Sequence, residues 1–124
     1  MSVILPSVWT VVLLDEVEAW YLELARTDPA ATDLVTASID LLAEVGPSLG
    51  RPAVDSIKGS TIHNLKELRA STIRVLFVFD PDRRAVLLVA GDKAGDWKGW
   101  YATNVPIAER RYKAWLAGTY DKGG

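Results

Sequence analysis

Residues 91–101, GDKAGDWKGWY, combine two lysines, two tryptophans and a tyrosine with glycines, directly after the uncharged run AVLLVA. A plain turn needs only small polar residues, so this composition calls for another explanation. Cations interleaved with aromatic rings suit a surface that holds a phosphate and a stacked nucleobase. The same side chains could instead fold under the protein as a hydrophobic flap, and this segment alone leaves both interpretations open.

Two arginines, Arg69 and Arg74, flank a short predicted turn at residues 70–73. In an antiparallel strand pair, residues placed in this way can lie near each other on one face of the sheet. The planar fork of an arginine binds two phosphate oxygens at once, so the pair predicts a phosphate site if that face is concave. The alternative is an ordinary surface ion pair with Glu67 or Asp80.

The first half of the chain predicts a strand followed by two helices. Residues 7–14, SVWTVVLL, are rich in β-branched side chains and predict a short strand. Apolar residues at helical spacing then predict a hairpin of two amphipathic helices over about 15–45, with Asp15 at the first N-cap position. The pattern restarts at Asp28-Pro29 and ends at Gly46-Pro47.

The second half predicts strands and one helix. Residues 46–60 have the composition of turns, and the alternation that follows predicts strands at 64–70, 72–79 and 85–90, with the last central in its sheet. Pro106 is expected to open a C-terminal helix, with a flexible tail at 118–124. The order predicts an α+β fold in one domain, 1–117: a strand, a two-helix hairpin, an antiparallel three-stranded meander on a mixed sheet, and a C-terminal helix. The hairpin should cover one face of the sheet.

Composition excludes several kinds of active site. The chain of 124 residues contains no cysteine, which excludes thiol catalysis, disulfides and cysteine-ligated zinc. A single histidine, His63, does not support a histidine-ligated metal site. The N-terminus lacks a basic segment before its apolar residues, and no run approaches the roughly 18 apolar residues of a membrane span. We therefore expect a cytoplasmic protein without a signal peptide or membrane association.

Charge is distributed unevenly along the chain. Residues 1–56 hold nine acidic and two basic side chains, whereas residues 57–124 hold twelve basic and seven acidic ones. This separation predicts one acidic flank and one basic flank, although acidic helix surfaces are common and would explain it equally well.

Residues 58–93, KGSTIHNLKELRASTIRVLFVFDPDRRAVLLVAGDK, resemble the RelE/HigB group of type II toxins, and within it the phage-derived HigB-like branch. The resemblance rests on the ELR triplet at 67–69, the RVLFVFD strand from Arg74, and an aliphatic strand that runs into a lysine-bearing loop. The upstream helical hairpin, Lys58-Gly59 and the C-terminal segment PIAERRYKAWL fit as well, so the resemblance covers about residues 8–117.

The resemblance implies a RelE-like microRNase fold and an mRNA interferase, an endoribonuclease that cleaves messenger RNA on the ribosome. It also implies a HigA-like helix-turn-helix antitoxin as partner, with operator DNA reached only through that antitoxin. No metal or cofactor is implied. Cleavage would follow the metal-free route in which the 2′-hydroxyl attacks the adjacent phosphate and leaves a 2′,3′-cyclic phosphate and a 5′-hydroxyl.

That reaction needs a base for the 2′ proton, cations for the charge that grows on the phosphate oxygens, and an acid for the leaving oxygen. The cations implied by the resemblance are Arg69, Arg74 and Lys93. Candidates for proton transfer are His63, Glu67, Asp96 and Tyr101. Further RNA contacts are expected from Lys58, Lys66, Lys98 and Trp100.

Each of these residues also has an ordinary structural interpretation. Asp96 could cap a turn at 95–97, a lone histidine is more often structural, and exposed lysines need no functional explanation. Lys66 alternates imperfectly with Arg69 and could face elsewhere. Trp97 is expected to be buried, because a large indole is rarely left exposed.

Two other functions are compatible with the same fold. One is a catalytically silent binding protein that works through complex formation and operon regulation, with the acidic hairpin as its informative surface. The other is a ParE-like gyrase inhibitor, although the ELR and RVLFVF strings favour the HigB-like branch.

Overall fold

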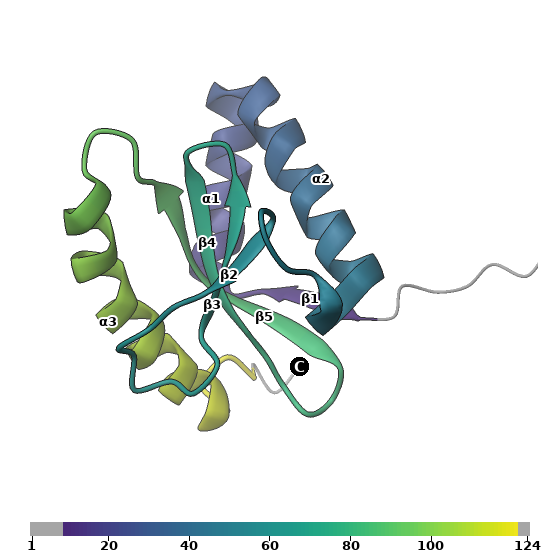
Figure 1. Ribbon diagram of the computed structural model, residues 1–124. Helices are drawn as coiled ribbons and strands as arrows, with labels where there is room; N and C mark the ends of the chain where they lie inside the picture. The colour runs from purple at the N-terminus through teal and green to yellow at the C-terminus, as the bar shows by residue number, and fades with distance from the viewer. Residues whose placement is uncertain (1–8, 122–124) are drawn as a thin grey trace, which may run out of the picture.

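One five-stranded sheet organises the chain, and the computed structural model describes residues 9–121 (Figure 1). In chain order the elements are β1 (Thr10–Leu13), α1 (Asp15–Thr27), α2 (Pro29–Val45), the short 3-10 helix η1 (Gly46–Ser48), β2 (Val54–Ser56), β3 (Lys66–Ala70), β4 (Ile73–Phe79), β5 (Arg84–Asp92) and α3 (Trp97–Leu116). The strand order is β1-β5-β4-β3-β2, with β1 parallel to β5 and the other neighbouring pairs antiparallel. The predicted α+β class, with a mixed sheet, two N-terminal helices and a C-terminal helix, is confirmed.

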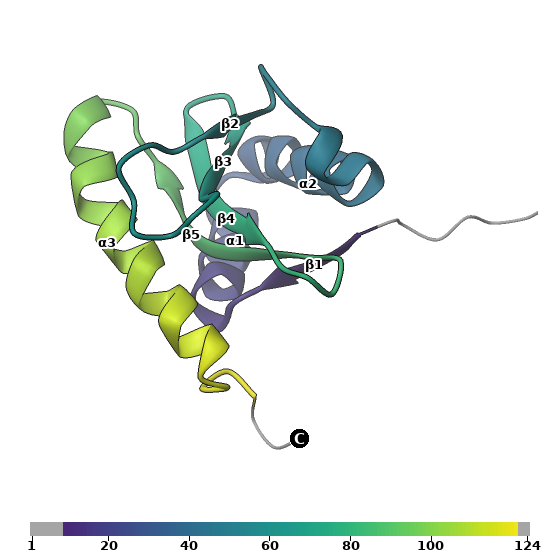
Figure 2. The ribbon, with the colours of Figure 1, turned by 60° about the horizontal axis from the view of Figure 1, so that its bottom comes forward.

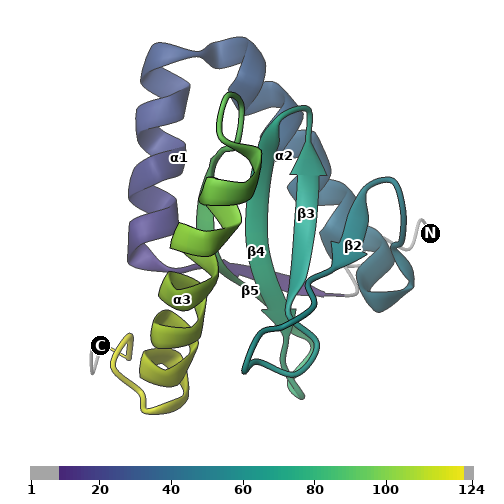
Figure 3. The ribbon, with the colours of Figure 1, turned by 60° about the vertical axis from the view of Figure 1, so that its left-hand side comes forward.

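Helices cover both faces of this sheet. One core cluster contains Leu76 of β4 and Trp100 of α3, and a second contains Phe77 of β4, Val17 of α1 and Leu42 of α2. In Figure 3, α3 lies in front of the sheet, and α1 and α2 lie behind it. The expectation that the helix pair covers one face is therefore confirmed. Because β4 is buried on both faces, its sequence is a nearly continuous apolar run.

The C-terminal helix begins at Trp97, so the prediction that Pro106 opens it is wrong. Asp96 occupies the N-cap position, and its Oδ1 accepts a hydrogen bond from the backbone N–H of Gly99 at 3.2 Å. Pro106 lies inside the helix, where its missing N–H removes one backbone hydrogen bond. The second half of GDKAGDWKGWY is consequently the first turn of a helix.

Strand positions differ from the prediction in two places. The strand β2 lies within the segment that we assigned to turns, because three residues are too few to show a two-residue alternation. The central strand is β4, and β5 is an interior strand paired with both β1 and β4. The predicted strand at 7–14 corresponds to β1, while residues 7 and 8 lie outside the described part of the chain.

The start of α1 and the end of the chain also differ. Asp15 is the first residue of α1, and the N-cap is Leu14, which makes no side-chain capping bond. Tyr120, in the predicted tail, donates a hydrogen bond to Glu16 Oε2 at 2.9 Å. Burial and this carboxylate raise the pKa of Tyr120 to about 12. The tail therefore contacts α1 through Tyr120, and residues 122–124 lie outside the described range.

A bulge between β4 and β5 is closed by a side chain from α3. Leu76 pairs with Val89 and Phe77 pairs with Leu87, which leaves Leu88 without a partner in the register. Arg111 Nη1 donates a hydrogen bond to the carbonyl oxygen of Leu88 at 2.9 Å. This bond satisfies a backbone acceptor in the core, where water cannot easily replace it.

Replacing Arg111 with methionine is expected to lower the free energy of unfolding by about 1–3 kcal/mol, because the Leu88 carbonyl would be left without its donor. Urea unfolding followed by circular dichroism would measure the loss. Arg110→Met is the matched control, since Arg110 is exposed and makes no ion pair or hydrogen bond within residues 9–121. Equal losses for the two variants would contradict the assigned role of Arg111.

Candidate functional site

Arg69 and Arg74 are directly opposite each other in the antiparallel pair of β3 and β4. Their strand neighbours Leu68 and Val75 pack in the core cluster on the α1/α2 side, so the two arginines project toward α3. The expectation that they lie close together on one face is confirmed. Two guanidinium groups on one face of the sheet give the basis of a site for a doubly coordinated anion.

Glu67 lies between these arginines and α3. Glu67 is only 4% exposed. Oε1 accepts hydrogen bonds from Arg69 Nη2 at 2.9 Å and Nε at 3.1 Å, and Oε2 accepts one from the Tyr101 hydroxyl at 2.6 Å. The Glu67 carboxylate raises the pKa of Arg69, and Asp55 on β2 adds a second ion pair to Arg69 at 3.1 Å. Glu67 thus holds a cation from β3 and a hydroxyl from α3 in one hydrogen-bonded group.

Arg74 is buried and only partly satisfied. Its Nη1 donates to the carbonyl oxygens of Ser71 at 2.7 Å and Ile73 at 2.9 Å. Its Nε is buried, lies 3.9 Å from Glu67 Oε2, and makes no hydrogen bond within the described residues. A buried N–H without an acceptor is costly, so this atom has hydrogen-bonding capacity that the described residues do not use.

Lys93 is covered by the exposed indole of Trp97. The lysine is 3% exposed, and its Nζ lies 3.2 Å from the centroid of the Trp97 ring, in a cation–π contact. Burial, together with the nearby positive charge of Arg74, lowers the pKa of Lys93, which makes its ammonium group a better proton donor. Trp97 itself is 67% exposed, so the expectation that it would be buried is wrong.

Trp100 and Tyr101 complete the site from the first turns of α3. Trp100 is buried in the core, and a Cβ added at Gly91 would lie 2.8 Å from its Nε1, so the glycine makes room for the indole. The ring of Trp100 meets that of Tyr101 edge to face at 5.2 Å. Burial, and secondly the hydrogen bond to Glu67, raise the pKa of Tyr101 and keep its hydroxyl protonated. Trp100 therefore supports Tyr101 from the core, and the ring open to a ligand is that of Trp97.

We call these seven residues the cation cluster: Asp55, Glu67, Arg69, Arg74, Lys93, Trp97 and Tyr101. Asp55 is the member that the sequence did not indicate. It lies opposite Glu67 in the register of β2 and β3, and the only signal for it would have been recognition of the three-residue strand β2.

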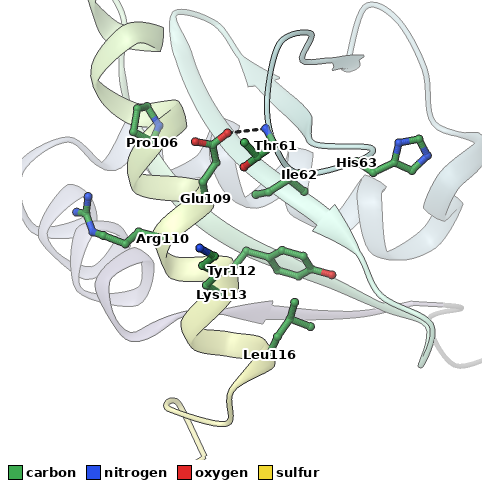
Figure 4. A pocket seen from close by; sticks show the side chains of 9 residues that line it. All are labelled: Thr61, Ile62, His63, Pro106, Glu109, Arg110, Tyr112, Lys113 and Leu116. Atoms are coloured by element: carbon green, nitrogen blue, oxygen red, sulfur yellow. Dashed lines mark hydrogen bonds between the residues drawn. The ribbon is translucent and has the colours of Figure 1, made fainter.

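The other predicted site residues lie elsewhere. Asp96 caps α3, and the exposed His63 lines a different pocket, beside the second half of α3 (Figure 4). Lys66 precedes Glu67 on β3, so it points to the other face of the sheet, and its Nζ lies 3.5 Å from Ser56 Oγ. Lys58 and Lys98 are exposed and make no hydrogen bond or ion pair within residues 9–121.

Neither a membrane-spanning helix nor a metal-binding group of side chains is found among the described residues. Between residues 9 and 121 no helix is long and apolar enough to cross a membrane. The same residues contain no group of three or more histidine, cysteine, aspartate or glutamate side chains arranged to hold a metal ion. Within this range, the cation cluster combines three positive side chains with a hydrogen-bonded hydroxyl–carboxylate pair. Such a set can bind a phosphodiester and transfer a proton beside it.

Comparisons with known proteins agree on one family. A family model described as "Phage derived protein Gp49-like" matches residues 22–113, a range that contains the whole cation cluster. "Putative toxin HigB3" of Mycobacterium tuberculosis (strain ATCC 25618 / H37Rv) is 52% identical over 115 residues, which cover 91% of this chain and 98% of that protein. "Putative toxin HigB2" of the same organism is 41% identical over 109 residues, covering 84% of this chain and 53% of that protein.

Proposed function

The chain belongs to the phage-derived Gp49-like family, which includes HigB-like toxins, and we propose that it is the toxin of a type II toxin–antitoxin system that cleaves messenger RNA on the ribosome. Its partner in this proposal is a helix-turn-helix antitoxin. The observation that carries the nuclease activity is the pairing of Arg69 and Arg74 beside the Glu67–Tyr101 hydrogen bond. The toxin role is supported by two relatives that are named toxins and are 52% and 41% identical to this chain.

In the proposed reaction the cations hold the scissile phosphate. Arg69 and Arg74 contact its non-bridging oxygens, and one donor is the Nε of Arg74, which has no hydrogen-bond acceptor within the described residues. The indole of Trp97 leaves Lys93 and stacks on a neighbouring base, which every nucleobase permits because each has a π-face. Lys93 is then in reach of the leaving oxygen.

Proton transfer uses the hydroxyl–carboxylate pair and the lysine. The 2′-oxygen forms a bond to phosphorus as its proton passes to the Tyr101 oxygen, and Tyr101 passes its own proton to Glu67 Oε2 at 2.6 Å. The bond from phosphorus to the 5′-oxygen breaks, and that oxygen takes a proton from the Lys93 ammonium. The products are a 2′,3′-cyclic phosphate and a 5′-hydroxyl, and no metal takes part. His63 and Asp96 have no role in this scheme.

Expression of the chain alone tests the proposal. We expect growth to stop after induction, and transcripts to be cut inside translated regions with new ends that carry a 5′-hydroxyl. Mapping of 5′ ends, with and without an inhibitor of translation initiation, measures both the cleavage and its dependence on the ribosome. Normal growth at high expression, with intact transcripts, would contradict the nuclease.

A second candidate is a catalytically silent binding protein on the same fold. The observation in its favour is that Arg69 already forms ion pairs with both Glu67 and Asp55, so part of the positive charge is neutralised inside the protein. This candidate predicts stable complex formation with an antitoxin and intact messenger RNA in the same experiment. A DNA-damage response without RNA cleavage would point instead to a gyrase inhibitor.

A further inference from the structure

A groove separate from the cation cluster runs beside the second half of α3. It is a cavity of about 660 Å³ between α3 and the loop that joins β2 to β3, and no residue of the cation cluster lines it. Figure 2 shows the loop beside α3, and Figure 4 shows the lining side chains at close range. We call it the α3 groove; along the helix it is lined by Pro106, Glu109, Arg110, Tyr112, Lys113 and Leu116, and from the loop by Thr61, Ile62 and His63.

The α3 groove is elongated. Its helical lining residues recur at intervals of three to four residues, so most of them share one face of α3. The eleven residues from Pro106 to Leu116 correspond to about 15 Å of helix, because ten steps separate the first from the last. A compact metabolite would use only part of this length, whereas a peptide segment that runs along α3 would contact all of it.

The chemistry of the α3 groove is apolar at its base and positive at its edge. Ile62 belongs to the core cluster on this face of the sheet, Tyr112 packs against that cluster, and Leu116 is 66% exposed. Arg110 and Lys113 are exposed, three positions apart, and form no ion pair within residues 9–121. Two free cations over an apolar base fit a protein segment better than an RNA strand, which needs a longer series of positive contacts.

The loop side of the α3 groove is fixed by Glu109. Its Oε2 accepts hydrogen bonds from Ser60 Oγ at 2.8 Å and from the backbone N–H of Thr61 at 2.7 Å. These hydrogen bonds lower the pKa of Glu109, and the bond from Thr61 has the largest effect. They also keep the charge of Glu109 directed at the loop. The carboxylate is thus occupied, and the wall is formed before any ligand arrives, which reduces the cost of binding.

We propose that the α3 groove binds an acidic, amphipathic helical segment of the antitoxin. Apolar side chains of that segment would cover Ile62, Tyr112 and Leu116, and carboxylates three or four positions apart would meet Arg110 and Lys113. This inference rests on the toxin–antitoxin role proposed above and not on nuclease activity. Because the groove excludes the cation cluster, the antitoxin docks on α3 without filling the proposed RNA site.

Two groove variants test the docking site by direct binding. The probe is the product of a helix-turn-helix reading frame to be identified directly beside the toxin gene. It is purified and titrated against the full-length toxin by biolayer interferometry. We expect Leu116→Asp and Lys113→Glu each to weaken binding at least tenfold. The first removes an apolar side chain that would become buried in the complex, and the second reverses a charge at the interface. Both side chains are exposed, so these changes should leave the fold intact, which thermal unfolding would verify.

Leu22→Asp is the matched control, because Leu22 is a 59% exposed leucine on the acidic hairpin. It should bind as the wild type does. The docking site would be refuted if the groove variants bind within twofold of the wild type, if Leu22→Asp is the variant that loses binding, or if the probe does not bind at all.

Cleavage by the groove variants should equal that of the wild type. If the wild-type protein has no nuclease activity, but antitoxin binding is lost only in the groove variants, the proposed nuclease activity is refuted. The docking site is then still supported.

Discussion

Replacing Arg74 with methionine is expected to slow cleavage of a reporter messenger RNA on translating ribosomes by about 100- to 1000-fold, the usual effect of removing one donor that stabilises transition-state charge. Arg74 is buried opposite Arg69, and its Nε is without a hydrogen-bond partner within the described residues. Methionine keeps most of the volume and removes the charge. The single-turnover rate in a purified translation system is the measurement.

Two further variants make this prediction specific. Arg74→Lys keeps the positive charge but cannot form a bidentate contact with two phosphate oxygens, so its cleavage rate should lie between those of the wild type and Arg74→Met. Arg26→Met removes an exposed arginine of α1, on the other face of the sheet, and should cleave at the wild-type rate. A folded Arg74→Met protein with a rate within threefold of the wild type would rule out its role at the phosphate.

Replacing Glu67 with glutamine is expected to lower the free energy of unfolding by about 3–5 kcal/mol, because it removes a buried negative charge and leaves the buried Arg74 without its ion-pair partner among the described residues. Glu67 is nearly fully buried and contacts Arg69, Tyr101 and, at 3.9 Å, Arg74. Glutamine has the same shape, so the change tests charge rather than packing. Chemical denaturation would measure the loss.

Asp55→Asn provides the comparison within the same cluster. Asp55 also pairs with Arg69, but its side chain is 25% exposed, so water can replace much of what the pair contributes. We expect a clearly smaller loss of stability than for Glu67→Gln. Equal losses in the free energy of unfolding would mean that the burial of Glu67 does not determine how much its contacts contribute to stability.

The arginine pair was predictable because the distance between the two residues along the chain fixes the register. Ala70 pairs with Ile73 across a two-residue turn, which puts Arg69 opposite Arg74 and on the same face. The elements that carry them follow from their apolar patterns. The fold class and the most direct part of the site therefore depend on local sequence.

The α3 side of the site was harder to predict because two helix-start signals competed. A proline at the first helical position is common, so Pro106 indicated the wrong start, although Asp96 is also a good N-cap residue. The true start places Trp97 at the first position of α3, where it is 67% exposed, and Trp100 almost one turn further along, where it is buried in the core. The contacts of Glu67 depend on where α3 crosses the sheet, which no local pattern encodes.

The contact between Lys93 and Trp97 has a consequence for the hydration of the site. Lys93 gives up most of its water shell when the chain folds, because only 3% of its surface is accessible. Dehydrating an ammonium group is unfavourable, so this burial reduces the stability of the free protein. In the proposed reaction, RNA that reaches Lys93 displaces an aromatic face instead of a tightly held water shell. Lys93 is thus dehydrated when the protein folds and would not need to be dehydrated again when the proposed RNA substrate binds.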